Sequence, residues 1–302
     1  MDADFWIAAD WGTTYLRAWM MSGATVVAEL KSDRGMGKLR PADFEPALLE
    51  LIEPWLAGRE NVEVLVCGMV GARQGWIETP YMATPTAPGS PGAAVNAPVR
   101  DGRIEVRILP GLCQANPPDV MRGEETQIAG LVLEQPGYSG IVCLPGTHSK
   151  WVHLNTGIVQ GFQTFMTGEV FELMSKGSVL RHSITDTGWD TEAFIFEFRA
   201  TLANPASLWA NFFSIRAQAL LADTAPGVAR ARLSGMLVGA EFAAAGVAAA
   251  DAPITIIGDE PLAIIYRDAF KLIGIEPSVV EAKKATLLGL CAARSTMKGD
   301  RT

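Results

Sequence analysis

Residues 7–19 read IAADWGTTYLRAW, and a similar stretch, IVCLPGTHSKWV, returns at residues 141–152. Each stretch is an apolar run, then Gly-Thr with a polar residue, then a second apolar run that carries one cation. Glycine lets the backbone turn tightly, and the threonine hydroxyls and turn N–H groups form a nest of the size of an anion. Two such hairpins, one in each half of the chain, predict two related domains that grip one polyphosphate between them.

The rest of the chain alternates between strand-like and helix-like patterns. We expect strands at 5–9, 15–21, 25–30, 62–67, 104–109, 140–144, 151–154, 158–165, 254–257 and 278–280. We expect helices at 41–56, 122–133, 168–176, 191–202, 207–221, 228–249, 261–273 and 283–295, and mostly loop at 80–98. Both halves therefore begin with three strands. The pattern predicts an α/β fold of two actin-like (ribonuclease H-like) domains with an active-site cleft between them.

Composition limits the domain organisation and the classes of partner. The 302 residues suffice for two domains, expected at 1–136 and 137–283, with a helix near 284–298 that could return to the first. A net charge of -8 argues against nonspecific binding of nucleic acid or anionic membrane. The four cysteines show no CxxC spacing, and the N-terminus lacks the basic region of a signal peptide. We therefore expect a cytoplasmic protein without a zinc or disulfide framework.

The first hairpin places a carboxylate, Asp10, at the end of a strand that is expected to be buried. Such a carboxylate can hold Mg²⁺ directly or through water, because Mg²⁺ prefers oxygen ligands and keeps several waters. The following Gly12, Thr13 and Thr14 can surround phosphate oxygens, and phosphoryl transfer mainly needs positioned donors and a metal. An ordinary hairpin with a capping Asp is the alternative. The second Gly-Thr turn, at Gly146, favours the phosphate-binding interpretation, which indicates an ATP-dependent phosphotransferase.

Two consecutive glutamates, Glu124 and Glu125, stand where a loop enters an expected helix. A sugar kinase needs a carboxylate that receives the proton of the acceptor hydroxyl. Acidic residues at a helix N-terminus also complement the macrodipole, which is the alternative reading. Adjacent side chains point in different directions, so at most one should face the substrate, and position favours Glu124. Arg122, just before them, could pair with them or bind an anionic substrate.

A glycine-rich segment follows the strand expected at 62–67 and carries Gly71, Arg73 and Trp76. Ligand sites lie at such strand ends in open α/β sheets, and Arg binds a carboxylate in a bidentate manner. A flexible surface loop is the alternative. Thr167, at a similar turn in the second half, could contact nucleotide or substrate, although a helix cap explains it equally well.

The last candidate turn joins an expected strand to an expected helix at Gly258 and Asp259. It could accept adenosine or a phosphate at the helix N-terminus, but many turns of this kind have the same sequence. Thr147 and His148 of the second hairpin could line the phosphate site. Lys150 could contact phosphate, although a lone lysine in a strand is usually solvated. The small residues at 234–241 indicate tight helix packing.

Taken together, the motifs resemble the 2-dehydro-3-deoxygalactonokinase family. They are DWGTT at 10–14, LRAW at 16–19, CGMVG at 67–71, PGLC at 110–113, MRGEETQ at 121–127, LPGTH at 144–148, MTGE at 166–169 and LSGMLVGAE at 233–241. The resemblance covers nearly the whole chain, and MRGEETQ and LPGTH are its most specific parts. One departure concerns the base, because sugar kinases of the wider superfamily commonly use an Asp where this chain offers two glutamates.

The resemblance implies ATP-dependent phosphorylation of the 6-hydroxyl of 2-dehydro-3-deoxy-D-galactonate. It also implies an actin-like fold, a first phosphate motif at 10–14, a second at 146–147 and an adenosine motif at 258–260. The two anionic substrates call for cations besides Mg²⁺, and Arg17, Arg73 and Arg122 are the candidates for the substrate carboxylate. The sequence leaves open which arginine binds it.

Two other functions stay open at this point. One is a kinase of the same fold for another sugar acid, such as 2-dehydro-3-deoxygluconate. The other is a nucleotide-binding regulator without a small acceptor, which the lack of a peptide-binding or DNA-binding extension disfavours. A homodimer is compatible with the sequence but is not indicated by any motif.

Overall fold

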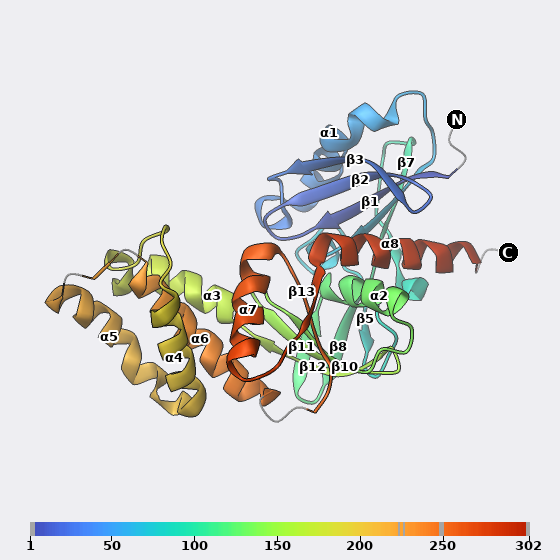
Figure 1. The fold of residues 1–302 in the computed structure, drawn as a ribbon. Helices are drawn as coiled ribbons and strands as arrows, with labels where there is room; N and C mark the ends of the chain where they lie inside the picture. Colours follow the sequence, from blue (N-terminus) through green and yellow to red (C-terminus); the bar gives the residue numbers. More distant parts are fainter. Residues whose placement is uncertain (1–3, 223, 226, 248–250, 300–302) are drawn as a thin grey trace. The chain divides into compact units, whose positions relative to one another are not determined.

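The computed structural model describes residues 4–222, 224–225, 227–247 and 251–299 (Figure 1). The chain divides into two compact units, each assembled from segments that are distant in sequence. Unit 1 comprises Met1–Ser139, His153–Gly161 and Val280–Thr302, and unit 2 comprises Gly140–Val152 and Phe162–Val279. The domain boundaries expected from the sequence, at 136–137 and near 283, stay predictions.

Unit 1 contains a six-stranded sheet in the order β3-β2-β1-β4-β7-β6. Its strands are β1 (Phe5–Trp11), β2 (Leu16–Ser22), β3 (Thr25–Ser32), β4 (Val62–Cys67), β7 (Ile104–Ile108) and β6 (Val95–Asn96). The first three pair antiparallel, whereas β1, β4 and β7 run parallel. The carboxyl ends of β1 and β4 therefore meet at one edge of the sheet, where Asp10 and Cys67 are register partners. This edge positions the first candidate site.

Helices cover the sheet of unit 1 on its buried faces. They are α1 (Phe44–Leu56), α2 (Glu124–Glu134) and α8 (Ala282–Gly299). Figure 1 shows α2 and α8 side by side, and glycines allow this contact. A Cβ on Gly130 would lie 2.0 Å from the Ala285 carbonyl oxygen, and one on Gly289 would lie 1.9 Å from that of Thr126. The close packing fixes the helix whose first residue is Glu124.

A three-stranded sheet in unit 1 was not expected from the sequence. It consists of β5 (Tyr81–Ala83), β8 (Gly111–Ala115) and β9 (Pro118–Met121), in the order β5-β8-β9. Residues 80–98 are mostly loop, as expected, apart from the short strands β5 and β6 and the helical turn Pro91–Ala93. Strands of two to five residues are too short to show a period, and the pairing of β5 with β8 depends on distant backbone groups.

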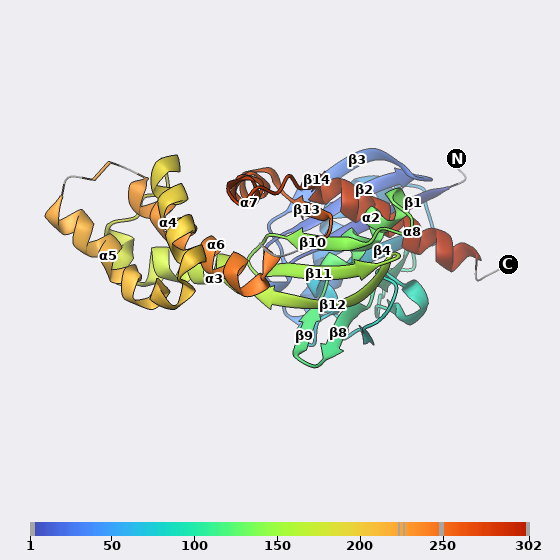
Figure 2. The ribbon, with the colours of Figure 1, turned by 60° about the horizontal axis from the view of Figure 1, so that its bottom comes forward.

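A second sheet, mostly within unit 2, has five strands in the order β12-β11-β10-β13-β14. They are β12 (Ile158–Phe165), β11 (Ser149–Asn155), β10 (Gly140–Leu144), β13 (Ile254–Gly258) and β14 (Ser278–Glu281). Figure 2 shows β10, β11 and β12 as neighbours. Strands β10 and β13 are parallel and buried throughout, as their continuous apolar runs predicted.

The remaining helices surround this sheet and a helical region of unit 2. They are α3 (Thr167–Glu172), which continues as a π-turn (Leu173–Gly177), then α4 (Thr191–Ala203), α5 (Leu208–Leu221), α6 (Val228–Ala245) and α7 (Glu260–Leu272). Single helical turns occur at Met36–Lys38, Pro41–Asp43, Met69–Gly71, Pro91–Ala93, Val179–His182 and Pro205–Ser207. Helices α4 and α6 pack closely, since a Cβ on Gly235 would lie 2.5 Å from the Phe194 carbonyl oxygen. This confirms tight packing at 234–241.

The helix expected at 228–249 is shorter than its pattern predicted. It ends at Ala245, because Gly246 adopts a left-handed backbone with φ of 66°. Residues 248–250 lie outside the described part of the chain. Within that part, none of the helices has both the length and the apolar character needed to cross a membrane.

Candidate active site

Asp10 lies where β1 ends, at the edge of the unit 1 sheet. Its Oδ2 is 3.5 Å from Nη1 of Arg17, its register partner on β2. The neighbouring Gly68 has a positive φ of 97°, and a Cβ there would lie 2.8 Å from the Trp11 carbonyl oxygen and 3.2 Å from Oδ1 of Asp10. Only glycine lets the chain leave β4 this close to the carboxylate.

The turn that follows Asp10 is held by backbone hydrogen bonds to the segment Gly35–Gly37. The N–H of Met36 donates to the Gly12 carbonyl over 3.0 Å, and that of Gly37 donates to the Thr13 carbonyl over 2.9 Å. Thr13 and Thr14 are exposed, so their hydroxyls remain accessible. Sequence reasoning missed this segment, although its paired glycines, Gly35 and Gly37, were a signal of close backbone approach.

The start of α2 brings two carboxylates to the same edge. Gly123, with φ of 108°, lies against Gly68, because a Cβ on it would be 3.3 Å from the Gly68 Cα. Glu124 is partly exposed, and its Oε2 accepts the Arg122 N–H at 3.0 Å. Glu125 is 1% exposed, and its Oε2 accepts the Gly123 N–H at 2.7 Å. The two glutamates therefore point to different environments, as the sequence predicted.

Burial makes Glu125 a weaker acid than an exposed glutamate. Removal from water, together with the nearby charge of Glu124, raises the pKa of this carboxyl from 4.5 to about 8. Asp10 and Glu125 both contribute, after burial, to raising the pKa of the Cys67 thiol. Asp10, Cys67 and Glu125 therefore lie close to one another at this sheet edge.

Arg122 is buried in unit 1 and held in place by Thr79. Its Nη2 donates to the Thr79 carbonyl oxygen at 2.9 Å, its Nη1 donates to the Thr79 hydroxyl, and its guanidinium lies 4.2 Å from the Tyr81 ring centre. Its Nε has no hydrogen-bond partner among the described residues. Gly71 makes room for this arrangement, because a Cβ there would lie 2.9 Å from Nη1. Gly71 and Arg122, both predicted to bind substrate, are therefore neighbours.

The other predicted substrate residues of unit 1 are placed differently. Arg73 is exposed, and its Nε donates to Oε1 of Glu78 at 3.4 Å. Trp76 is buried in the core and stacks on Phe44 with ring centres 6.2 Å apart. A core position accounts for Trp76 without a ligand, and Arg73 pairs with Glu78 rather than with Arg122.

In unit 2, the second Gly-Thr turn is held by the first turn of α3. The N–H of Glu169 donates to the Thr147 carbonyl at 2.9 Å, and a Cβ on Gly168 would lie 2.4 Å from the Gly146 carbonyl oxygen. His148 turns to Glu169, with 2.5 Å between Nε2 and Oε2. Lys150 is buried, which excludes the alternative of a solvated lysine.

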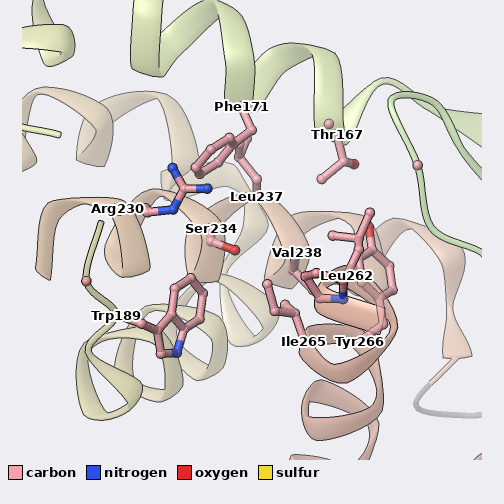
Figure 3. A pocket seen from close by; sticks show the side chains of 14 residues that line it. Thr167, Phe171, Trp189, Arg230, Ser234, Leu237, Val238, Leu262, Ile265 and Tyr266 are labelled. Atoms are coloured by element: carbon pink, nitrogen blue, oxygen red, sulfur yellow. The ribbon is translucent and has the colours of Figure 1, made fainter. Parts of the chain in front are cut away.

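A cavity of about 490 Å³ adjoins this turn (Figure 3). Its walls come from the turn, from α3, from the segment before α4, and from α6 and α7. They are Gly146, Thr167, Gly168, Phe171, Gly188, Trp189, Arg230, Ser234, Leu237, Val238, Pro261, Leu262, Ile265 and Tyr266. In Figure 3, Trp189 and Arg230 lie on one side and Leu262 and Tyr266 on the other. The cavity is mostly apolar with a few polar groups, as expected for a small-molecule site.

The predicted adenosine motif lies beside this cavity. Gly258 ends β13 and is buried, and Asp259 is the exposed N-cap position of α7. Pro261 and Leu262, which come directly after Glu260, form part of the cavity wall. Sequence reasoning missed most of the wall, including Phe171, Trp189 and Arg230. The LSGMLVGAE pattern at 233–241 was a signal for Ser234, but tight packing explained it sufficiently.

Metal chemistry can be tested against the donors present. Within the described residues, no group of three or more His, Cys, Asp or Glu side chains could enclose a metal ion. Mg²⁺ does not need such a group, because it binds through one or two carboxylates together with substrate phosphates and water. The single carboxylate of Asp10, beside an exposed threonine turn, fits this mode.

The sheet order, with parallel central strands and an antiparallel β1-β2-β3 hairpin pair in unit 1, defines an actin-like fold of the sugar-kinase class. A structure of the activator of 2-hydroxyisocaproyl-CoA dehydratase from Clostridium difficile, with bound ADPNP, shares this fold at a TM-score of 0.55 and 12% identity over 98% of this chain and 97% of its own. The profile of the 2-keto-3-deoxy-galactonokinase family matches residues 10–293. The chain belongs to this family.

Full-length relatives agree with the assignment. A protein of Rhizobium meliloti, named a probable 2-dehydro-3-deoxygalactonokinase, is 38% identical over 96% of this chain and 97% of its own. The 2-dehydro-3-deoxygalactonokinase of Escherichia coli is 32% identical over 94% of this chain and 96% of its own. A crystal structure from Sinorhizobium meliloti, assigned to the same activity, has a TM-score of 0.89 and 38% identity, and covers 97% of this chain and 99% of its own. The chain is thus a carbohydrate kinase, which confirms the resemblance found in its motifs.

Proposed function

We propose that this kinase transfers the γ-phosphoryl group of ATP to the 6-hydroxyl of 2-dehydro-3-deoxy-D-galactonate, in galactonate catabolism. One observation carries the acceptor side of the proposal. The MRGEETQ segment begins α2 beside Asp10, so a partly exposed carboxylate, a glycine pair and an exposed Thr13-Thr14 turn share one sheet edge of unit 1. The full-length relatives named for this activity supply the substrate.

Glu124 is our candidate for the base. Its carboxylate is partly exposed, whereas Glu125 is sealed from solvent and holds a backbone N–H. A base must reach the proton that it accepts, and access therefore favours Glu124. Glu125, with its raised pKa, would remain protonated near neutral pH and would support the start of α2.

Asp10 would hold Mg²⁺ through its carboxylate, with the Gly12–Thr14 turn on the phosphate oxygens. When bound, the ion would spread the negative charge of the transferring group. Arg17 and Arg73 keep partly exposed guanidinium groups that could bind the carboxylate of the sugar acid. Arg122 is committed to Thr79, and its role would be to fix the segment that precedes Glu124. Which arginine binds the carboxylate stays a prediction.

We place the nucleotide in the cavity of unit 2. The Gly146–His148 turn would meet phosphates, Thr167 would contact them from α3, and the apolar wall of α6 and α7 would accept adenosine. The Gly258-Asp259 motif would set the start of α7 at the adenosine end. Arg230 would supply a cation near the ligand. The expected cleft between the two domains stays a prediction.

The test is coupled ADP release with Mg-ATP and each of two sugar acids, 2-dehydro-3-deoxy-D-galactonate and 2-dehydro-3-deoxygluconate. We expect strong turnover with the galactonate derivative and at least tenfold lower kcat/KM with its epimer. Equal turnover would retain the kinase and contradict the substrate assignment. Slow ATP hydrolysis at a rate that neither sugar acid changes would support a nucleotide-binding regulator instead.

We also propose a cytoplasmic homodimer. All four cysteines are free, which suits a reducing compartment where ATP is available.

The dimer proposal rests on helix α5. Besides its core-facing side, the helix carries an exposed apolar stripe of Trp209, Phe213 and Leu220, followed by Leu221, with exposed fractions of 79%, 61%, 62% and 88%. The stripe would bury about 500 Å² per subunit, most of the ~800 Å² typical of a stable interface.

A further inference from the structure

Behind the cavity of unit 2, a carboxylate is buried in the protein interior. Glu241, on α6, is 2% exposed. Its Oε1 accepts the indole N–H of Trp151 at 2.8 Å, and its Oε2 accepts the hydroxyl of Tyr266 at 2.7 Å. Trp151 comes from β11 and Tyr266 from α7, so this one side chain joins three elements.

Two hydroxyl residues complete the group. The Thr167 side chain is hydrogen-bonded to the same carboxylate, and the Ser149 Oγ lies 3.0 Å from the Tyr266 hydroxyl. Burial raises the pKa of Glu241, and the bonds from Thr167, Tyr266 and Trp151 oppose that rise. A buried carboxylate without these hydrogen-bond donors would strongly destabilise the fold. The position of Glu241 therefore determines where the donor side chains must lie.

The group reaches the cavity through two of its members. Thr167 and Tyr266 both line the cavity. Thr167 is also the first residue of α3, and the next two residues hold the phosphate turn: Gly168 packs on Gly146, and Glu169 donates to the Thr147 carbonyl. A fixed Thr167 therefore fixes both a cavity wall and the Gly146-Thr147 backbone.

We infer that Glu241 is a positioning residue for nucleotide binding: it acts through Thr167 and Tyr266 to hold the wall of the cavity and the second Gly-Thr turn. This inference rests on the proposed nucleotide site. An apolar residue of similar volume would pack equally well against the surrounding helices. Only an acceptor with two oxygens can orient an indole, a phenol and a threonine hydroxyl at once, and a bound ligand requires that orientation.

The experiment is calorimetric titration of the full chain with Mg-ADP. Glu241→Gln retains volume but removes the charge and one acceptor. We expect about tenfold weaker Mg-ADP binding and a raised KM for ATP, with the KM for the sugar acid unchanged. In the double variant with Thr167→Val, the two losses should not add, since one residue acts through the other.

Glu197 provides a matched control within the same unit. It is also a buried glutamate, 3% exposed, and its Oε1 accepts the Arg232 Nε at 2.6 Å, while it lies outside the cavity wall that the structure describes. Glu197→Gln should lower the melting temperature and leave Mg-ADP affinity unchanged. Equal weakening of nucleotide binding by both variants, or normal affinity in Glu241→Gln, would overturn the positioning role.

Trp189→Ala separates this inference from the proposed nucleotide site, because Trp189 lines the cavity without contacting Glu241 in any described hydrogen bond. Weaker Mg-ADP binding in Trp189→Ala with normal binding in Glu241→Gln would retain the site and refute the positioning role. Normal binding in both would refute both. Should Glu241→Gln not fold, Tyr266→Phe and Thr167→Val replace it: each should weaken binding several-fold, and normal affinity in both contradicts the inference.

Discussion

The two Gly-Thr turns share a sequence pattern, but the protein supports them in different ways. The turn at Gly12 is held by main-chain hydrogen bonds to the Gly35–Gly37 segment, and the carboxylate before it, Asp10, remains partly accessible. The turn at Gly146 is held by α3, and the carboxylate behind it, Glu241, is buried under four side chains. We propose that the acid beside the first turn serves chemistry and that the acid behind the second turn serves positioning.

The sharpest test of this difference is Asp10→Asn. If Asp10 serves chemistry, the variant should lose about a thousandfold in kcat, because its neutral amide cannot hold Mg²⁺ beside the phosphates. Glu241→Gln should instead act mainly on nucleotide affinity. The measurement is coupled ADP release, with Asp33→Asn, an exposed partner of Lys38, as the control. A kcat loss of less than tenfold in Asp10→Asn would remove the contrast between the two turns.

Of the two glutamates at the start of α2, the candidate base should matter more. Glu124→Gln should lower kcat by about a hundredfold, whereas Glu125→Gln should lower it less than tenfold. The reason is access, since Glu125 is sealed and Glu124 is not. Both variants are assayed at saturating ATP and sugar acid. The reverse order of effects would make Glu125 the base and would require α2 to move before catalysis.

The close backbone contacts that hold each Gly-Thr turn can be disrupted separately. Gly35→Ala would place a Cβ 2.2 Å from the Thr14 carbonyl carbon, and Gly168→Ala would place one 2.4 Å from the Gly146 carbonyl oxygen. Each should cost about 1–3 kcal/mol in stability and raise the KM for ATP. Chemical denaturation and steady-state kinetics check both.

Gly92→Ala and Gly177→Ala are the controls for these two variants, because no described atom lies within 4 Å of a Cβ at either position. They should leave the KM for ATP unchanged. If Gly35→Ala and Gly168→Ala behave like these controls, close bracing is irrelevant to both turns.

Much of this arrangement could be predicted from the sequence. Apolar runs predicted the bounds of β4 and β10 correctly, because strands buried on both faces leave a continuous pattern. The helix beginning at Glu124 was expected from its acidic first turn, and the two hairpins were expected from their glycines. These signals are local, so a single sequence contains them.

What could not be predicted depends on distant partners. Strand β5 joins β8 through pairing between residues about thirty positions apart, and its three residues are too few to show a period. The Gly35–Gly37 brace, the Thr79 contact of Arg122 and the cavity wall at Trp189 likewise arise only when remote segments meet. Glu241 lay inside a motif that tight packing explained, and nothing local indicated the side chains that donate hydrogen bonds to it.

The buried carboxyl of Glu125 gives the folded chain an expected response to pH. Glu125 has a pKa of about 8 in the folded chain against 4.5 ordinarily, so folding favours its protonated form. Its contribution is present below pH 4.5 and is lost as the pH rises toward 8. The melting temperature of the wild type should therefore fall between pH 4.5 and 8 relative to that of Glu125→Gln. Parallel thermal curves for the two proteins between pH 5 and 8 would contradict the buried, protonated state of Glu125.

The smallest effect on turnover is expected at the exposed stripe of α5, which lies away from both turns in sequence and carries no proposed ligand contact. Trp209→Ser combined with Leu221→Ser should convert a dimer into a monomer, because the two side chains are among the most exposed apolar groups of the described chain. Turnover per subunit should stay within about twofold of wild type, since an interface outside the site contributes stability rather than catalysis. Light scattering after size-exclusion chromatography gives the mass, and Val27→Ser, an exposed apolar change on β3 of unit 1, is the control. A wild-type chain that is monomeric at all concentrations, or a dimer that survives the double change, would contradict the proposal that this stripe forms a dimer interface.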